Sequence, residues 1–193
     1  MAKITKSAVT NVFNGQADIV LFDAPTGGYT SSTTFANVTA SGSSLGQVKG
    51  DSTSWDGEDA TFDNVVDEQG NVIVAKSTAG TFGFSCELAN VSAANAVLFL
   101  KGANVTPTGT PVSINNIANL VKAGISIPVI VRPIAIFNDE ANRFIMLPKA
   151  RILANLSMDN KLFSIKLSCV GEMIDTTELG TILIGDGSPV YNT

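Results

Sequence analysis

Residues 143–170 constrain the fold of this chain more than any other stretch, because they repeat with the two-residue period of half-buried β-strands. The repeat sets Phe163, Ile165, Leu167 and Cys169 against Ser164, Lys166 and Ser168, and sets Ala150, Ile152 and Ala154 against Lys149, Arg151 and Asn155. Between the two runs, Asp159 and Asn160 carry side chains that tolerate turn geometry. The sequence therefore predicts a long antiparallel hairpin with one face in a core and the other in solvent.

Other segments of the chain are also typical of a mainly β protein. Short strands are predicted at residues 16–24, 72–76, 79–88 and 181–184, and a weaker strand, interrupted by a flexible tip, at residues 33–49. A further strand is predicted at residues 126–137, where Pro128 and Pro133 each remove a hydrogen-bond donor from the ladder. We therefore expect that strand to lie at a sheet edge or to contain a bulge.

Two short helices are expected between these strands. The first runs for about ten residues after Ser92, which is a suitable N-cap, and ends at Gly102. The second begins after Ser113 and ends at Gly124, although its three Asn residues weaken the helical pattern. The chain is thus expected to hold one or two short helices packed on a sheet.

The composition indicates a single domain that associates with other chains. The chain has 193 residues, of which 45% are hydrophobic and only 15% are charged, whereas an ordinary soluble domain has about 25% charged residues. A surface so poor in charge suggests burial against other subunits. Within one domain of residues 1–193 we expect an N-terminal arm at 1–12, an early flexible hairpin or loop at about 26–49, and a polar C-terminal tail at 176–193.

Several classes of chemistry are disfavoured by the residues that the chain lacks. It has no histidine, which excludes Ser-His-Asp and Cys-His catalysis and His-based zinc sites. Its net charge is −5 and its twelve basic residues are scattered, which disfavours tight binding to a phosphate backbone. Cys86 and Cys169 are expected to be buried free thiols, with a single disulfide as the alternative. No catalytic residue, cofactor or metal is therefore predicted.

The sequence shows neither of the two patterns that would direct it to a membrane. The start MAKITK lacks the apolar core of a secretory signal. Residues 125–137 are apolar but are interrupted by prolines and an arginine, and they fall short of the roughly 20 residues of a spanning helix. We expect neither export nor membrane insertion.

Residues 51–68 form an acidic segment with seven of the seventeen carboxylates and no Lys or Arg. These carboxylates belong to Asp51, Asp56, Glu58, Asp59, Asp63, Asp67 and Glu68. Their spacing matches a calcium loop only loosely, because the ordered ligand positions and the closing Glu are missing. An exposed acidic loop beside a strand is the simpler interpretation, with Trp55 packed under it or placed at an interface.

A paired-carboxylate hydrolase is the remaining enzymatic interpretation. It would need Asp139 and Glu140 to converge with Asp175 and Glu178. Those residues lie at strand ends and in the tail, where solvated carboxylates are common. No enzymatic activity is expected.

The order of these elements resembles that of bacteriophage tail tube proteins and of the related tube proteins of contractile injection systems. The resemblance rests on the flexible early segment, the acidic W-D-G-E-D run, the strand with G-T-F-G-F-S, the short helix and the late strands with F-I-M-L-P-K-A and F-S-I-K-L, over roughly residues 10–175. It implies two packed antiparallel sheets, as a β-sandwich or barrel, flanked by a helix. It also implies hexameric rings that stack into a hollow tube.

The resemblance assigns roles to parts of the sequence. The early loop, here within residues 26–49, would join ring to ring together with the termini, and its candidate contact residues are Thr26, Tyr29, Phe35, Leu45 and Lys49. Some of Asp51, Asp56, Glu58, Asp59, Asp63 and Asp67 would line the lumen and repel passing DNA, with the outer wall as the alternative location.

The resemblance also implies partners and a location. The partners would be further copies of the chain, other tail proteins such as a terminator, sheath or tape measure, and DNA in transit, with no membrane. The location would be the virion tail, assembled in the host cytoplasm. The alternatives are a decoration or neck protein that does not polymerise and, third, a fimbrial subunit.

Overall fold

The structure is a computed structural model of the 193-residue chain. It describes residues 17–49, 52–55, 57–59, 61–78, 80–89, 97–99, 103–105, 120–122, 129–138, 142–159 and 162–187. The predicted N-terminal arm at residues 1–12 and the last residues of the tail lie outside this range. The predicted mainly β class is confirmed.

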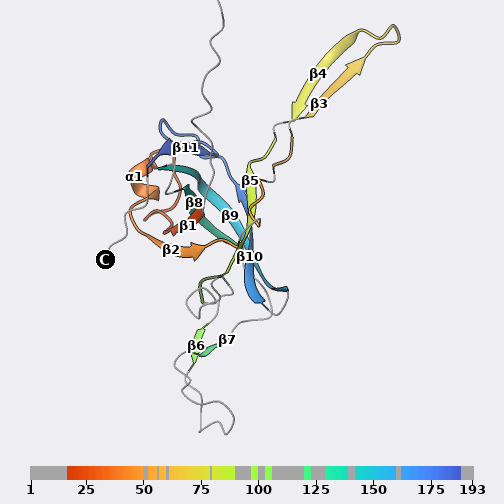
Figure 1. Ribbon diagram of the computed structural model, residues 1–193. Helices are drawn as coiled ribbons and strands as arrows, with labels where there is room; N and C mark the ends of the chain where they lie inside the picture. Colours follow the sequence, from red (N-terminus) through yellow and green to blue (C-terminus); the bar gives the residue numbers. More distant parts are fainter. Residues whose placement is uncertain are drawn as a thin grey trace, which may run out of the picture.

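The main body is one seven-stranded antiparallel sheet (Figure 1). Its strands, in order, are β2 (Gly42–Gln47), β1 (Ala17–Phe22), β8 (Ile130–Asn138), β9 (Arg143–Asp159), β10 (Leu162–Gly171) and β5 (Gly83–Leu88), and β11 (Leu183–Asp186) pairs with the first residues of β9. The described strands do not include a second sheet packed on this one. The sandwich that the resemblance implies is thus not seen within this part of the chain.

The hairpin predicted from the two-residue period is confirmed as β9 and β10. Ile152 pairs with Cys169 and Ala154 with Leu167, and all four side chains lie in the core. One position differs from the prediction, because Ser164 was expected in solvent and is only 1% exposed. Its hydroxyl donates a hydrogen bond to the Glu87 carboxylate, which compensates the burial of this polar group.

Strand β8 is central, between β1 and β9, so the expectation of an edge strand is wrong. The alternative expectation, a bulge, is confirmed: the register to β9 shifts between Arg132 and Ile134, on either side of Pro133. A bulge accommodates proline because one residue is left out of the ladder. From Ile134 to Asn138 every residue is buried, so both faces of this strand are covered.

Two hydrophobic clusters lie on the two faces of the sheet. The larger lies on one face of all the main strands and includes Phe84, Cys86, Ile152 and Leu167. The smaller lies on the other face, where the following residues meet: Val20, Val38, Ala135, Phe137, Met146, Ile174 and Leu179. Val38 comes from a short helix and Ile174 and Leu179 from the segment after β10. These two segments therefore cover only one half of that second face.

The short helix is α1 (Phe35–Val38), and the interrupted strand predicted at residues 33–49 is wrong there. Thr34 and Asn37 form a capping box, in which each side chain binds the other residue's backbone N–H. Strand β2 follows and pairs with β1 along most of its length. The segment expected as an early flexible loop thus contributes a helix, an edge strand and core residues.

Two further pairs of strands lie outside the sheet (Figure 1). Strands β3 (Thr61–Val66) and β4 (Val72–Thr78) form a two-stranded ribbon that projects from the body, drawn in yellow at the upper right of Figure 1. We call residues 61–78 the projecting hairpin. Among the described strands, β3 and β4 make extensive contact only with each other.

The second pair consists of β6 (Ala103–Val105) and β7 (Leu120–Lys122). The predicted loop from residue 103 is therefore a strand at its start. The predicted helix at 113–124 is wrong at residues 120–122, which form β7, and the rest of that prediction lies outside the described residues. Residues 97–99 are helical, in agreement with the first predicted helix, and the remainder of that helix lies outside the described residues.

Candidate functional site

The chain just after β2 meets β5, the strand at the other end of the sheet order. Val48 and Leu88 form an antiparallel bridge, and the Lys49 N–H donates to the Glu87 carbonyl at 2.8 Å. Further along the chain, Ser54 and Ser85 exchange two backbone hydrogen bonds, at 2.9 and 2.8 Å. The segment after β2 therefore covers the edge of β5, which would otherwise offer unpaired backbone groups to another chain.

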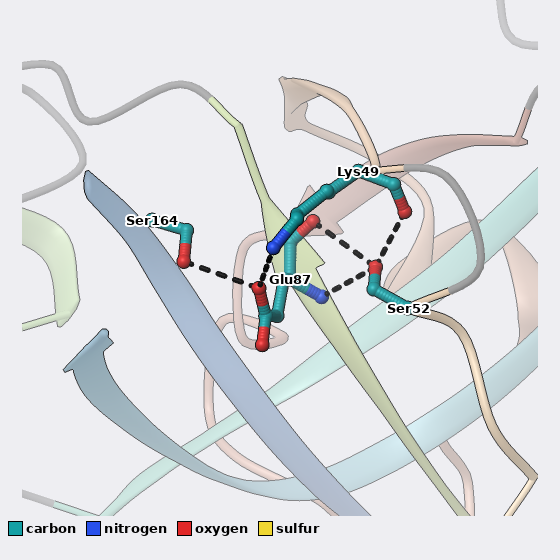
Figure 2. A network of polar contacts seen from close by, with 4 residues as sticks. All are labelled: Lys49, Ser52, Glu87 and Ser164. Carbon is teal, nitrogen blue, oxygen red and sulfur yellow. Dashed lines mark hydrogen bonds and ion pairs between the residues drawn. The ribbon is translucent and has the colours of Figure 1, made fainter. Parts of the chain in front are cut away.

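We call the pairing of Val48, Lys49 and Ser54 with β5 the seam. Four side chains stabilise it through hydrogen bonds and an ion pair (Figure 2). Glu87 Oε2 accepts from Lys49 Nζ at 3.3 Å and from Ser164 Oγ at 3.2 Å. Ser52 Oγ donates to the Lys49 carbonyl at 2.6 Å and accepts from the Glu87 N–H at 3.1 Å. Sequence reasoning did not identify Glu87 as a key residue, because its partners lie 38 and 77 positions away. The network joins β5, β10 and the segment after β2.

The predicted inter-ring residues do not form one exposed loop. Thr26 is exposed in a turn where the Gly28 N–H donates to the Pro25 carbonyl. Phe35 is partly exposed and its ring lies 6.3 Å from that of Phe144. Two of the five are engaged inside the body: Leu45 is a core residue, 2% exposed, and Lys49 belongs to the seam. Leu45 is thus unavailable for a contact between copies in this conformation.

Tyr29, the fifth of these residues, lines a pocket of 220 Å³ beside Lys149 and Asp175. Lys149 Nζ lies 5.6 Å from the centre of the Tyr29 ring and 2.7 Å from Glu172 Oε2. Burial, with a smaller effect of the Glu172 charge, raises the pKa of Tyr29 to about 12. The Tyr29 hydroxyl is buried and has no hydrogen-bond partner among the residues that the structure describes. The pocket has room for several water molecules.

The predicted acidic residues are distributed along the projecting hairpin and its base. Glu58 and Asp59 are exposed at the base, where Glu58 exchanges hydrogen bonds with Thr81 at 2.9 and 3.1 Å. Asp63 lies in β3 opposite Lys76 in the ladder. Asp51 and Asp56, two more of the six candidate lumen residues, lie outside the described residues.

Asp67 has a structural role in the turn of the hairpin. Its Oδ1 accepts from the Gln69 and Asn71 N–H groups at 2.9 and 2.8 Å, and its Oδ2 accepts from the Asn71 side chain at 3.0 Å. The hydrogen bond from the Asn71 side chain is the largest cause that lowers the pKa of Asp67. Gly70, with φ of 84°, takes the left-handed conformation that completes the turn. The strand after this turn was predicted at residues 72–76, but β3 before it was not.

One half of the second face of the sheet is uncovered in the described structure. The cross-strand pairs there are Arg151 with Val170, Leu153 with Ser168, Asn155 with Lys166, Ser168 with Ser85 and Lys166 with Glu87. We call these positions on β5, β9 and β10 the open face. Leu153 is 44% exposed and Val170 is 43% exposed. The segment after β10 begins beside it, where Arg151 Nε donates to Glu172 at 2.9 Å.

The remaining candidates do not assemble into a chemical site. Asp175 is exposed, while Glu178 Oε2 accepts from the Phe35 N–H at 2.8 Å and so attaches the tail to α1. Asp139 and Glu140 lie outside the described residues. Trp55 is partly exposed and its ring lies 5.3 Å from that of Phe84, at the end of the core. Cys86 and Cys169 are buried free thiols, as predicted.

Comparison with known proteins gives no family for this chain. No protein-family model matches it, and no curated protein is significantly similar to it. In the described part of the chain, no helix is long and apolar enough to span a membrane. The surfaces described above are therefore the basis for any statement about function.

Proposed function

We propose that this protein is a structural subunit that assembles with copies of itself into stacked rings, which form the hollow tail tube of a bacteriophage. The observation that carries the proposal is the projecting hairpin together with the open face. This chain has one element that extends beyond its own body and one strand face on which Leu153 and Val170 are exposed among polar side chains. Both features offer surface for contact with another copy.

The hairpin supports the proposal through its limited stability. A two-stranded hairpin is at best marginally stable in water and needs a further strand or a packed face. Val65, on this hairpin, is 57% exposed, and the sequence around it is rich in β-branched residues. Contact with another copy would supply the burial that the body of its own chain does not.

The seam supports the finer part of the predicted fold. We propose that the bridge between Val48 and Leu88 closes the seven-stranded sheet into a small barrel around the larger hydrophobic cluster. Closure removes edges that would otherwise pair at random. Copies would then associate through the projecting hairpin and the open face rather than through an unpaired sheet edge.

The excess of acidic over basic residues is consistent with the passage of DNA through the tube. Exposed carboxylates such as Glu58, Asp59 and Glu68 repel phosphates within a screening length of about 8–10 Å, so DNA would slide without binding. In this proposal the partners are further copies of the chain, other tail proteins such as a terminator, sheath or tape measure, and DNA in transit. The location is the virion tail, assembled in the host cytoplasm, and the subunit number of six comes from the resemblance.

Electron microscopy of the purified chain tests the proposal. Long hollow tubes or six-fold rings are expected, and a variant without residues 61–78 should lose them while keeping a folded body. Small particles of uniform size would instead favour a decoration or neck protein that attaches without polymerising. A lumen role for the acidic residues is tested by Glu58→Lys with Asp59→Lys in assembled virions, where unchanged DNA ejection would count against it.

A further inference from the structure

We propose that the projecting hairpin of one copy packs on the open face of a second copy, so that the two-layer sandwich is completed between chains. The inference rests on the proposed function, because it names the surface that joins the copies. The hairpin is a twisted two-stranded ribbon, and the open face is a three-stranded one. Two such layers pack about 10 Å apart, with side chains of the facing surfaces interdigitated.

The shape of the open face suits a second β layer. The side chains at its centre are small, because Ser85 pairs with Ser168 and Gly83 pairs with Val170. Leu153 and Val170 stand on either side of these small residues and are exposed. A ribbon that carries Val65 outward would cover both aliphatic side chains and would remove apolar surface from water on each copy.

The charges of the two surfaces are complementary. The hairpin contains Asp63, Asp67 and Glu68 against Lys76, and its net charge is −2. The open face contains Arg151 and Lys166 against Glu87, and its net charge is +1. Lys166 is exposed at the centre of this set. Opposite charges steer the encounter and disfavour contact between two hairpins or two open faces.

The occupant is a second copy rather than the same chain. The hairpin leaves the body at residues 58 and 81, which hydrogen-bond to each other, and from there it extends away from the sheet (Figure 1). Covering its own open face would require the ribbon to fold back over this base.

Cross-linking between two single-cysteine variants tests the inference. Glu68→Cys on the hairpin and Ser168→Cys on the open face are mixed, assembled and treated with a bis-maleimide that spans about 10 Å. A dimer band that needs both variants is expected. Cys86 and Cys169 are buried and stay unmodified in the native protein. The control replaces Ser168→Cys by Thr177→Cys, which is exposed on the tail segment and should give no mixed band.

Charge reversal gives a second readout that does not depend on cross-linking geometry. Lys166→Glu should raise the concentration needed for assembly about tenfold, and Glu68→Lys in the same chain should restore part of the loss. Tubes that form without a mixed cross-link, or that ignore Lys166→Glu, would overturn the docking surface and leave the proposed function standing. A chain that never associates would overturn both.

Discussion

The carboxylate of Glu87 is expected to contribute more to the free energy of unfolding than any acidic residue of the hairpin. Glu87→Ala removes the acceptor of the Ser164 hydroxyl, which is buried, and the partner of Lys49 Nζ. The backbone bridge between the segment after β2 and β5 would remain, because it uses carbonyl and N–H groups. The variant therefore isolates the contribution of the side-chain network at the seam.

The expected loss follows from the two contacts. A buried hydroxyl left without a partner costs about 1–3 kcal/mol. The ion pair adds little, since the Lys49 and Glu87 side chains are 31% and 21% exposed and such pairs are worth about 0–1 kcal/mol. Glu87→Ala should thus lower the free energy of unfolding by about 1–4 kcal/mol. Ser164→Ala should cost about 1 kcal/mol, and the double variant less than the sum of both.

Urea unfolding of the dilute chain measures these values, with the fluorescence of Trp55 as the signal. Trp55 lies against the core residue Phe84, so its emission should report loss of the core. The matched control is Glu68→Ala, an exposed carboxylate of the hairpin, which should change the free energy by less than about 0.5 kcal/mol. Equal effects of Glu87→Ala and Glu68→Ala, or strict additivity with Ser164→Ala, would refute the reasoning about the seam.

The remaining predictions concern pH. Burial raises the pKa of Cys86 to about 12 and that of Cys169 well above 9.0, so unfolded thiols ionise at a lower pH than folded ones. Their stabilisation is complete below pH 9 and decreases above it by about 1.4 kcal/mol per pH unit and thiol, and Cys86→Ala should show a shallower decline of the urea midpoint. A decline that is unchanged in Cys86→Ala would refute this assignment. Hydrogen bonds from Lys149 and Arg151, the Lys149 bond being the largest cause, lower the pKa of Glu172 below 4.5. Its contribution is present above pH 4.5 and is lost as the pH falls through the lower folded value, so Glu172→Gln should flatten the acid limb of the stability curve, and an identical limb would contradict the role of this carboxylate.

The two-residue alternation of apolar and polar residues predicted the β9–β10 hairpin, because this pattern depends only on neighbouring positions in each strand. The alternation from Ala150 to Ala154 and from Ile165 to Cys169 was sufficient to assign β9, β10 and their core face. It failed at Ser164, because burial there depends on Glu87, a residue of another strand. Local pattern carries no information about which distant side chain will cover a given position.

Proline placement and helix formation show the same limit. Pro133 restricts a strand to an edge or a bulge, and only the arrangement of β1 and β9 around β8 decides between them. Helix α1 is too short for a periodic signal, and the capping box of Thr34 and Asn37 is hidden in a run rich in Ser and Thr. The second hydrophobic cluster was missed for a related reason, since α1 and the segment after β10 meet only in the folded chain.

The candidate surfaces were predicted less well than the fold. The segment at residues 26–49 was expected to be a flexible hairpin or loop, because it is rich in Gly, Ser and Thr, yet Leu45 of β2 packs in the core. The element that does project is the hairpin at residues 61–78, whose first strand was interpreted as an acidic loop. Charge at Asp63 and Asp67 obscured the strand pattern of the apolar residues beside them.

Sedimentation velocity of the wild-type chain over a range of concentrations tests the central claim most directly. If copies join through the projecting hairpin and the open face, the mass should rise from the monomer to rings and longer assemblies as the concentration increases, and removal of residues 61–78 should keep it at the monomer. A wild-type chain that remains a folded monomer at every concentration would contradict the account.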